Sequence, residues 1–201
     1  MELVKYNKNT MLYTKKGDDG TTKLFDSPKG VRLNKDDIIF EALGTVDEVN
    51  SAIGYAKSII QTESSAYTLT INNKTQALKE VLEIIQNNLF SVQAELAGSK
   101  DLVQKSHIEY QEAIIAAVEH AIPPITTFLI PGGDTASAYL DVCRTIARRA
   151  ERLVVKASLQ YPERVSESIL QFLNRLSSVL YALARFVNHT QNMHENPPTY
   201  S

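Results

Sequence analysis

The chain carries a row of arginines at a spacing that suits a polyanion. Four of its eight arginines fall between positions 144 and 152, and Arg144, Arg148 and Arg152 share one arc of a helix wound at about 100° per residue. Like charges spaced i, i+4 cost about 0.2–0.5 kcal/mol per pair, so something should compensate for them. A guanidinium group suits phosphate because its planar fork forms two parallel hydrogen bonds. A solvated basic face tempered by Asp141 and Glu151 explains the same pattern, and both interpretations stay open.

A second group of phosphate-compatible residues lies near the N-terminus. Residues 14–23 read T-K-K-G-D-D-G-T-T-K, which brings glycines, hydroxyls and lysines close together. Backbone N–H groups, hydroxyls and ammonium groups of such a segment can surround a phosphate chain. The segment is not a Walker A loop, because no G-K-[ST] follows. Taken alone, it is more simply a polar, turn-rich arm.

Composition limits the class of protein. With 201 residues, 43% of them hydrophobic, the chain is expected to form a single domain over 1–201. A net charge of −2 argues against a general nucleic-acid binder, which needs a surplus of basic residues. No apolar run approaches the ~20 residues of a membrane span, and the first residues carry no signal or transit pattern. The sequence therefore predicts a cytoplasmic protein that binds neither membrane nor nucleic acid, with the lone Cys143 in its core.

The spacing of apolar residues predicts an all-α fold with five helices. They are expected over about 37–60, 74–97, 106–121, 134–160 and 165–189, with a loop at 62–73 and no convincing strand. Asp134 or Thr135 is expected to cap the arginine helix after the turn at Pro131, Gly132 and Gly133. Short connections favour antiparallel neighbours, hence a five-helix bundle over 38–190. A non-helical arm over 1–37 precedes it, and an irregular tail over 191–201 follows it.

One face of the first expected helix consists of small residues around a single acid. Gly44, Ser51 and Gly54 share this face with Asp47. Glycine in a helix interior costs about 0.5–1 kcal/mol relative to alanine, which suggests close approach of another helix or a ligand. Asp47 is placed to pair with an arginine of the later helix, although a solvent-facing aspartate would need no such partner.

Two common chemistries of helical bundles find no support. A di-iron site needs Glu-x-x-His pairs, and no histidine of this chain has an acid three residues before it. No G-x-S-x-G motif indicates a hydrolase, and no metal site is expected. The remaining polar groups suit one ligand with several phosphates, which would use the arm, Lys35, the arginine row and Asn174 together.

Five separated motifs resemble one enzyme family. They read Y-T-K-K-G-D-D-G-T-T at 13–22, F-E-A-L-G-T-V-D-E-V-N-S-A-I-G at 40–54, F-L-I-P-G-G at 128–133, R-T-I-A-R-R-A-E-R at 144–152 and L-N-R-L-S at 173–177. In this order they resemble the ATP:cob(I)alamin adenosyltransferases of propanediol-utilisation systems and human mitochondria. The resemblance implies a ferritin-like five-helix bundle that forms a homotrimer, with ATP bound between subunits by the N-terminal arm and the arginine helix.

The resemblance also implies a role for individual residues. Arg148 would be important for adenosyl transfer, Asp47 would form a salt bridge with Arg144, and Phe128 would occupy the lower face of the corrin and displace its benzimidazole ligand. Ser178 would lie toward the corrin. Contacts to ATP are implied for Thr14, Lys15, Lys16, Gly17, Thr22, Lys23, Lys35, Arg148, Arg149, Glu151, Arg152 and Asn174.

The implied reaction explains why no acid–base pair stands out. Cob(I)alamin is itself a nucleophile that attacks the 5′ carbon of ATP and expels triphosphate, so the protein supplies positioning and electrostatics. Arginines and lysines, with Mg²⁺ on the triphosphate, would stabilise the leaving group. A cobalamin reductase and an adenosylcobalamin-dependent enzyme are the implied partners. The alternative is a non-catalytic bundle that senses or carries ATP or cobalamin.

Three positions depart from the family pattern. Asp141 stands where the family usually has His, Ser178 where it has Asp, and Gln93 where it has Gly. Asp141 lies one turn before Arg144 and is expected to compete with Asp47 for it. The departures leave the ATP motifs whole and concern the handling of cobalamin.

Overall fold

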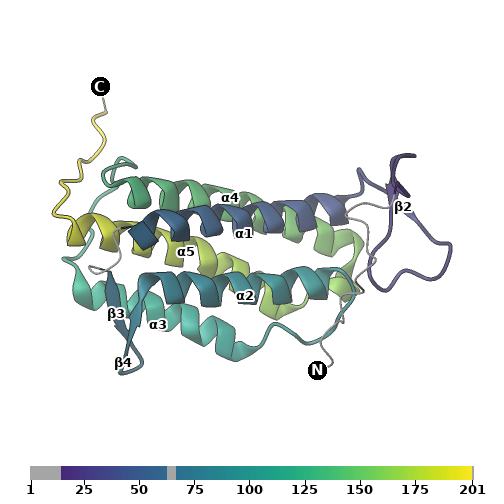
Figure 1. The fold of residues 1–201 in the computed structure, drawn as a ribbon, viewed down its shortest axis with the longest axis horizontal. Helices are drawn as coiled ribbons and strands as arrows, with labels where there is room; N and C mark the ends of the chain where they lie inside the picture. Colours follow the sequence, from purple (N-terminus) through teal and green to yellow (C-terminus); the bar gives the residue numbers. More distant parts are fainter. Residues whose placement is uncertain (1–14, 63–66, 201) are drawn as a thin grey trace.

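The computed structural model describes residues 15–62 and 67–200, apart from the side chains of 61 and 62. Five long helices dominate these residues (Figure 1), so the predicted all-α bundle is confirmed. The helices are α1 Ile38–Thr62, α2 Leu78–Leu96, α3 Lys105–Ala121, α4 Thr135–Gln160 and α5 Glu167–Thr190. The short 3₁₀ helix η1 Pro162–Arg164 joins α4 to α5.

Two short hairpins correct the prediction that the chain has no strand. Strands β1 Thr21–Thr22 and β2 Leu33–Asn34 pair in the arm, and β3 Thr68–Ile71 pairs with β4 Lys74–Ala77 between α1 and α2. The loop expected at 62–73 therefore contains a strand, and the helix expected from Lys74 begins only at Leu78. The second hairpin has a cause in the sequence, because Thr-Leu-Thr-Ile of β3 alternates exposed and buried residues. Asn72 and Asn73 adopt positive φ of 49° and 61°, as a tight hairpin turn requires.

Packing makes α5 the central helix of one half of the bundle. α1 packs against α2 and α4, α4 packs against α5, and α5 packs against α3 (Figure 1). From Leu176 to Asn188 almost every α5 residue is buried, because α4 and α3 cover it from two sides. Polar residues inside this stretch therefore need partners within the protein. None of the helices within 15–62 and 67–200 is long and apolar enough to cross a bilayer.

The N-terminal arm is fastened to the end of the bundle where α4 finishes (Figure 1). Arg164 of η1 forms an ion pair with Asp26 at 3.1 Å, and the Tyr161 hydroxyl donates to Asp37 Oδ2 at 2.7 Å. Leu24 is buried against the core. The arm is non-helical as predicted, and these contacts fix it near the C-terminal end of the arginine helix.

Candidate functional site

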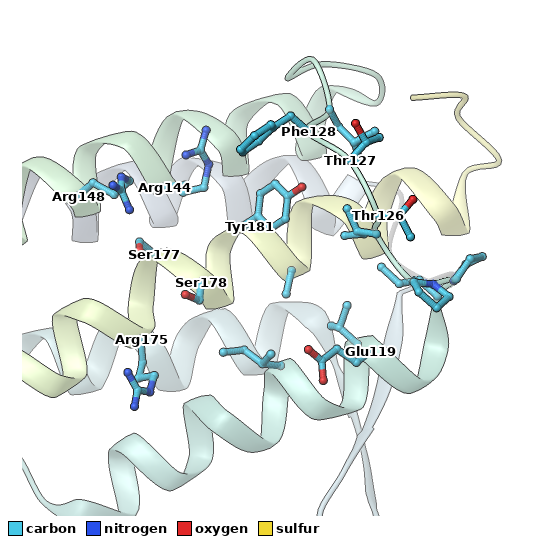
Figure 2. Close-up of a pocket in the computed structure, with 18 residues that line it drawn as sticks. Glu119, Thr126, Thr127, Phe128, Arg144, Arg148, Arg175, Ser177, Ser178 and Tyr181 are labelled. Atoms are coloured by element: carbon cyan, nitrogen blue, oxygen red, sulfur yellow. The ribbon is translucent and has the colours of Figure 1, made fainter. Parts of the chain in front are cut away.

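A groove of about 1320 Å³ opens between α3, α4, α5 and the segment 122–129. Phe128, Arg144 and Arg148 follow one another along one edge, α5 forms the floor, and α3 forms the opposite edge (Figure 2). Four residues predicted as site residues line it, namely Phe128, Arg144, Arg148 and Ser178. Sequence reasoning missed its other polar residues as members of one site, namely Glu119, Thr126, Thr127, Arg175, Ser177 and Tyr181.

The segment 122–129 supplies an apolar wall. Pro123 and Pro124 lack the N–H that would continue α3, so the chain runs without helix from Ile122 to the start of α4. The Phe128 side chain remains 80% exposed although it is large and apolar. A side chain of this kind at the rim of a groove suits contact with an apolar face of a ligand.

The Pro-Gly-Gly turn after Phe128 sets the start of α4. Gly133 has φ +97°, and a Cβ added there would lie 2.5 Å from Oδ1 of the buried Asn188, so only glycine fits. That same Oδ1 accepts a hydrogen bond from the Asp134 N–H at 2.9 Å, while Asn188 Nδ2 donates to the Gly132 carbonyl at 2.9 Å. The Asp134 side chain accepts from the Ala136 N–H at 2.8 Å, which confirms it as the N-cap.

The arginine row divides into paired and unpaired members. Arg144 Nε donates to Asp141 Oδ1 at 2.9 Å, and its side chain is 24% exposed. Arg148 and Arg152 are exposed and form no ion pair with any residue in the described part of the chain. Two free guanidinium groups one turn apart are the arrangement that a polyanion binds.

Asp47 does not pair with Arg144 within one chain, and the salt bridge implied by the resemblance stays a prediction. Asp47 instead accepts a hydrogen bond from Gln93 Nε2 at 3.1 Å, while Arg144 pairs with Asp141. Arg144 pairs with Asp141 because Asp141 lies one turn away on the same helix. Asp141 is also buried, where an ion pair is shielded from water. Gln93 and Asp141 are two of the positions that depart from the family pattern, and together they occupy both members of the expected pair.

The close approach expected at the small-residue face of α1 is not formed inside the chain. A Cβ added at Gly44 would meet nothing within 4 Å, and one at Gly54 would meet only the end of the Gln86 side chain at 3.2 Å. Gly44, Asp47 and Ser51 are exposed. This face is therefore open surface in the single chain.

The other predicted ligand residues of α4 and α5 lie outside the lining of the groove. Asn174 Nδ2 donates to Glu151 Oε1 at 2.9 Å, and Arg175 Nη1 donates to Asn174 Oδ1 at 2.9 Å. Arg149 pairs with Glu48 of α1. The structure thus brings Glu151 and Asn174 together and directs Arg149 to a different neighbour.

The structure keeps the predicted arm residues together but away from the groove. Lys35 Nζ donates to the Gly17 carbonyl at 2.7 Å, and a Cβ at Gly17 would lie only 3.0 Å from this Nζ. Arg32 Nη2 donates a hydrogen bond to the Lys16 carbonyl at 2.6 Å. Lys15, Thr22 and Lys23 belong to the same arm, none of these residues lines the groove, and Thr14 lies outside the described residues.

The electrostatics of the site offer cations rather than an acid–base pair. Burial raises the pKa of Cys143 to about 12, so this thiol on the apolar side of α4 is a core residue, as predicted. Within 15–62 and 67–200, no group of three or more His, Cys, Asp or Glu residues is placed to hold a metal ion. What the groove can do is orient a large ligand and stabilise negative charge.

Comparison with known proteins decides the family. The model of the family described as cobalamin adenosyltransferase matches residues 12–187. The chain belongs to the cobalamin adenosyltransferase family. It is 37% identical over 181 residues to the corrinoid adenosyltransferase of Bacillus subtilis, covering 88% of this chain and 86% of that protein. It is 35% identical to the human corrinoid adenosyltransferase MMAB over 185 residues, covering 87% and 68%.

Solved structures of the family agree with the fold. A variant of the PduO-type ATP:corrinoid adenosyltransferase from Lactobacillus reuteri, complexed with cobalamin and ATP, superposes with a TM-score of 0.79 at 33% identity, covering 94% of this chain and 96% of that one. Another variant of the same enzyme, complexed with ATP, gives a TM-score of 0.77 at 32% identity, covering 94% and 100%. The groove and the arginine row of this chain therefore belong to a fold that holds both ligands in a relative.

Proposed function

We propose that this chain transfers the 5′-deoxyadenosyl group of ATP to cob(I)alamin, giving adenosylcobalamin and triphosphate. The observation that carries the proposal is the groove, which places along one edge the exposed Phe128 and Arg148, an arginine with no ion pair among the described residues. Family membership, with relatives named corrinoid adenosyltransferases at 35–37% identity, supports the same activity.

The size of the groove favours a macrocycle. Pockets for ordinary small molecules measure about 300–1,000 Å³, and this groove measures about 1320 Å³. Its apolar wall over 122–129 and the side chains of Ile115 and Val118 suit the face of a corrin ring, and Ser178 and Tyr181 offer hydroxyls on the floor. We propose that cobalamin, as the substrate, binds here with Phe128 against its lower face.

The reaction breaks one bond and forms another without a protein nucleophile. The cobalt electron pair of the substrate attacks the 5′ carbon, the bond from this carbon to the triphosphate oxygen breaks, and its electron pair leaves with the triphosphate. Arg148 and Arg152 would stabilise the charge that grows on this leaving group, because fixed donors gain strength as negative charge develops. The apolar wall would keep water from the reacting atoms.

The separation of arm and groove supports an assembly with shared sites. Within one chain the lysines of the arm do not reach the groove lining, yet both sets of residues suit one ATP. We propose a homotrimer in which the arm and the α4 arginines of neighbouring subunits bind one ATP. Mg²⁺ would be bound with the triphosphate. The cytoplasmic location and the reductase and recipient-enzyme partners stay predictions.

A spectroscopic assay tests the proposed function. Protein, ATP and Mg²⁺ are mixed with chemically reduced cobalamin, and the visible spectrum is followed for adenosylcobalamin, with samples lacking ATP or protein as controls. Product that requires both supports the proposal. ATP binding without product would favour the non-catalytic alternative.

A further inference from the structure

A buried cluster of charges lies behind the groove and has no part in the chemistry above. Arg185 of α5 is only 1% exposed, and its guanidinium contacts two acids, Asp141 of α4 and Glu195 of the C-terminal segment, the latter at 2.6 Å. A buried arginine needs compensating charge, because an unpaired ion inside a protein is costly. Glu195 supplies part of this compensation from outside the helical bundle.

One carboxylate joins this cluster to the groove. Asp141 accepts from Arg144 through Oδ1 at 2.9 Å and from Arg185 through Oδ2. The ring of Tyr181 lies beside both guanidinium groups, 5.9 Å from that of Arg144 and 5.1 Å from that of Arg185. Arg144 and Tyr181 line the groove (Figure 2). The position of Arg144 therefore depends on how strongly Asp141 is drawn toward Arg185.

The C-terminal segment also holds the turn after Phe128. Asn188 Nδ2 donates to Glu195 Oε1 at 2.7 Å and to the Gly132 carbonyl at 2.9 Å. The Ile130 N–H donates to the Asn196 carbonyl at 2.9 Å. A second, smaller cavity of about 280 Å³ is lined by both the 122–127 segment and Glu195. The tail thus supports the segment that forms the apolar wall of the groove.

We propose that Glu195 is a positioning residue for cobalamin binding and acts on Arg144 through Arg185 and Asp141. The two arginines and the two acids carry two positive and two negative charges. The charge of Arg185 is therefore compensated by Asp141 and Glu195 together. Without the charge of Glu195, Asp141 alone must compensate Arg185, and its hold on Arg144 weakens. Through Glu195, the irregular C-terminal segment thus helps to position a residue that lines the groove.

The inference rests on the proposed function and is tested with Glu195→Gln in the full chain. Gln keeps the shape and the acceptor oxygen but removes the charge. We expect the KM for cob(I)alamin to rise about threefold to tenfold, the size of coupling seen between residues of one polar network. The KM for ATP should change less than twofold. Glu195→Asp, which restores the charge, should recover part of the loss.

A second variant separates positioning from mere stabilisation. In an Arg144→Gln background, adding Glu195→Gln should raise the KM for cob(I)alamin less than twofold further, because the route through Arg144 is already broken. Glu109→Gln, which removes an acid from the exposed Lys105 pair on α3, serves as the control and should leave both KM values unchanged. Thermal melting confirms that each variant is folded.

Three results would overturn the inference. The first is an unchanged KM for cob(I)alamin in Glu195→Gln, including the case in which only kcat falls because less of the protein is folded. The second is an equal rise in both KM values, and the third is the same rise with and without Arg144. Failure of the proposed function is a separate outcome, because the wild-type chain would then form no adenosylcobalamin.

Discussion

Replacing Arg148 by alanine should remove catalysis without weakening the fold. Arg148 is exposed, forms no ion pair within the described residues and lines the same edge of the groove as Phe128, beyond Arg144 (Figure 2). Its neighbour one turn on, Arg152, also has no ion pair in the part of the chain that the structure describes, whereas Arg144 pairs with Asp141. The α4 surface therefore keeps two like charges side by side with no structural benefit.

Arg148→Ala should slightly raise the free energy of unfolding but strongly lower kcat. Removing one member of an i, i+4 like-charge pair returns about 0.2–0.5 kcal/mol, and alanine is at least as good a helix former as arginine. The free energy of unfolding should therefore rise slightly. For a chain of this length the gain corresponds to an increase of about 1 °C in Tm. Loss of a charged donor to the leaving triphosphate should lower kcat by about 10²–10³, or about 2.7–4 kcal/mol.

The assay compares kcat and thermal melting of Arg148→Ala with those of Lys156→Ala. Lys156 is exposed on the same helix, four residues beyond Arg152, and does not line the groove. Its removal should give the same small gain in stability and leave kcat unchanged. Near-wild-type turnover of Arg148→Ala would refute the assigned role, and a large drop in its Tm would show that the side chain has a structural partner instead.

The remaining predictions concern the two ends of the groove and the core beneath it. Phe128→Ala should fold and bind ATP as before, measured by calorimetry, but lose adenosyl transfer to cobalamin, because we propose that this exposed ring contacts the corrin and not ATP; an equal loss of ATP affinity would contradict that role. Gly133→Ala should lower the free energy of unfolding in urea by about 1–3 kcal/mol, since φ +97° and a contact of 2.5 Å with Asn188 leave no room for a Cβ. Burial raises the pKa of Cys143 to about 12, so only about one part in ten thousand of this thiol is thiolate at pH 8. Cys143 should therefore react with a thiol reagent only after unfolding. Rapid labelling of the native protein would contradict the burial of this side chain.

The helices were predictable because their apolar residues repeat at helical spacing over long stretches. The N-cap at Asp134 followed from one polar residue after a glycine turn. The ends of α3 at Ala121 and of α4 at Gln160 followed from Pro123 and Pro162. The hairpin at 68–77 was missed because four residues of alternating burial are too few to separate from a loop, and its turn uses Asn72-Asn73 rather than the more telling Asn-Gly.

From residue spacing alone, the site was predictable only where one helix carries it, whereas Phe128 and Ser178 were named from the family resemblance. The positions of Arg144, Arg148 and Arg152 follow from helical winding alone, so their row was visible before the fold. The contribution of Thr126, Thr127 and Glu119 depends on how α3 and the segment after it lie across α5, which no local pattern encodes. The competition of Asp141 for Arg144 was predictable from their spacing of three residues, whereas the burial of Asp141 and its second partner Arg185 were not.

The pairing of Arg144 with Asp141 also separates two roles that the sequence pattern joined. A guanidinium held by a buried carboxylate is already compensated, so it should contribute less to binding a triphosphate than Arg148 and Arg152, which form no ion pair within the described residues. Arg144 instead faces Tyr181 at the floor of the groove, at the end nearer Phe128 (Figure 2). The row therefore passes from a fixed, compensated arginine near the apolar wall to free arginines toward the arm. We propose that such a gradient orders two ligands along one helix, with an apolar ring at the first end, a polyanion at the second and the reacting atoms between them.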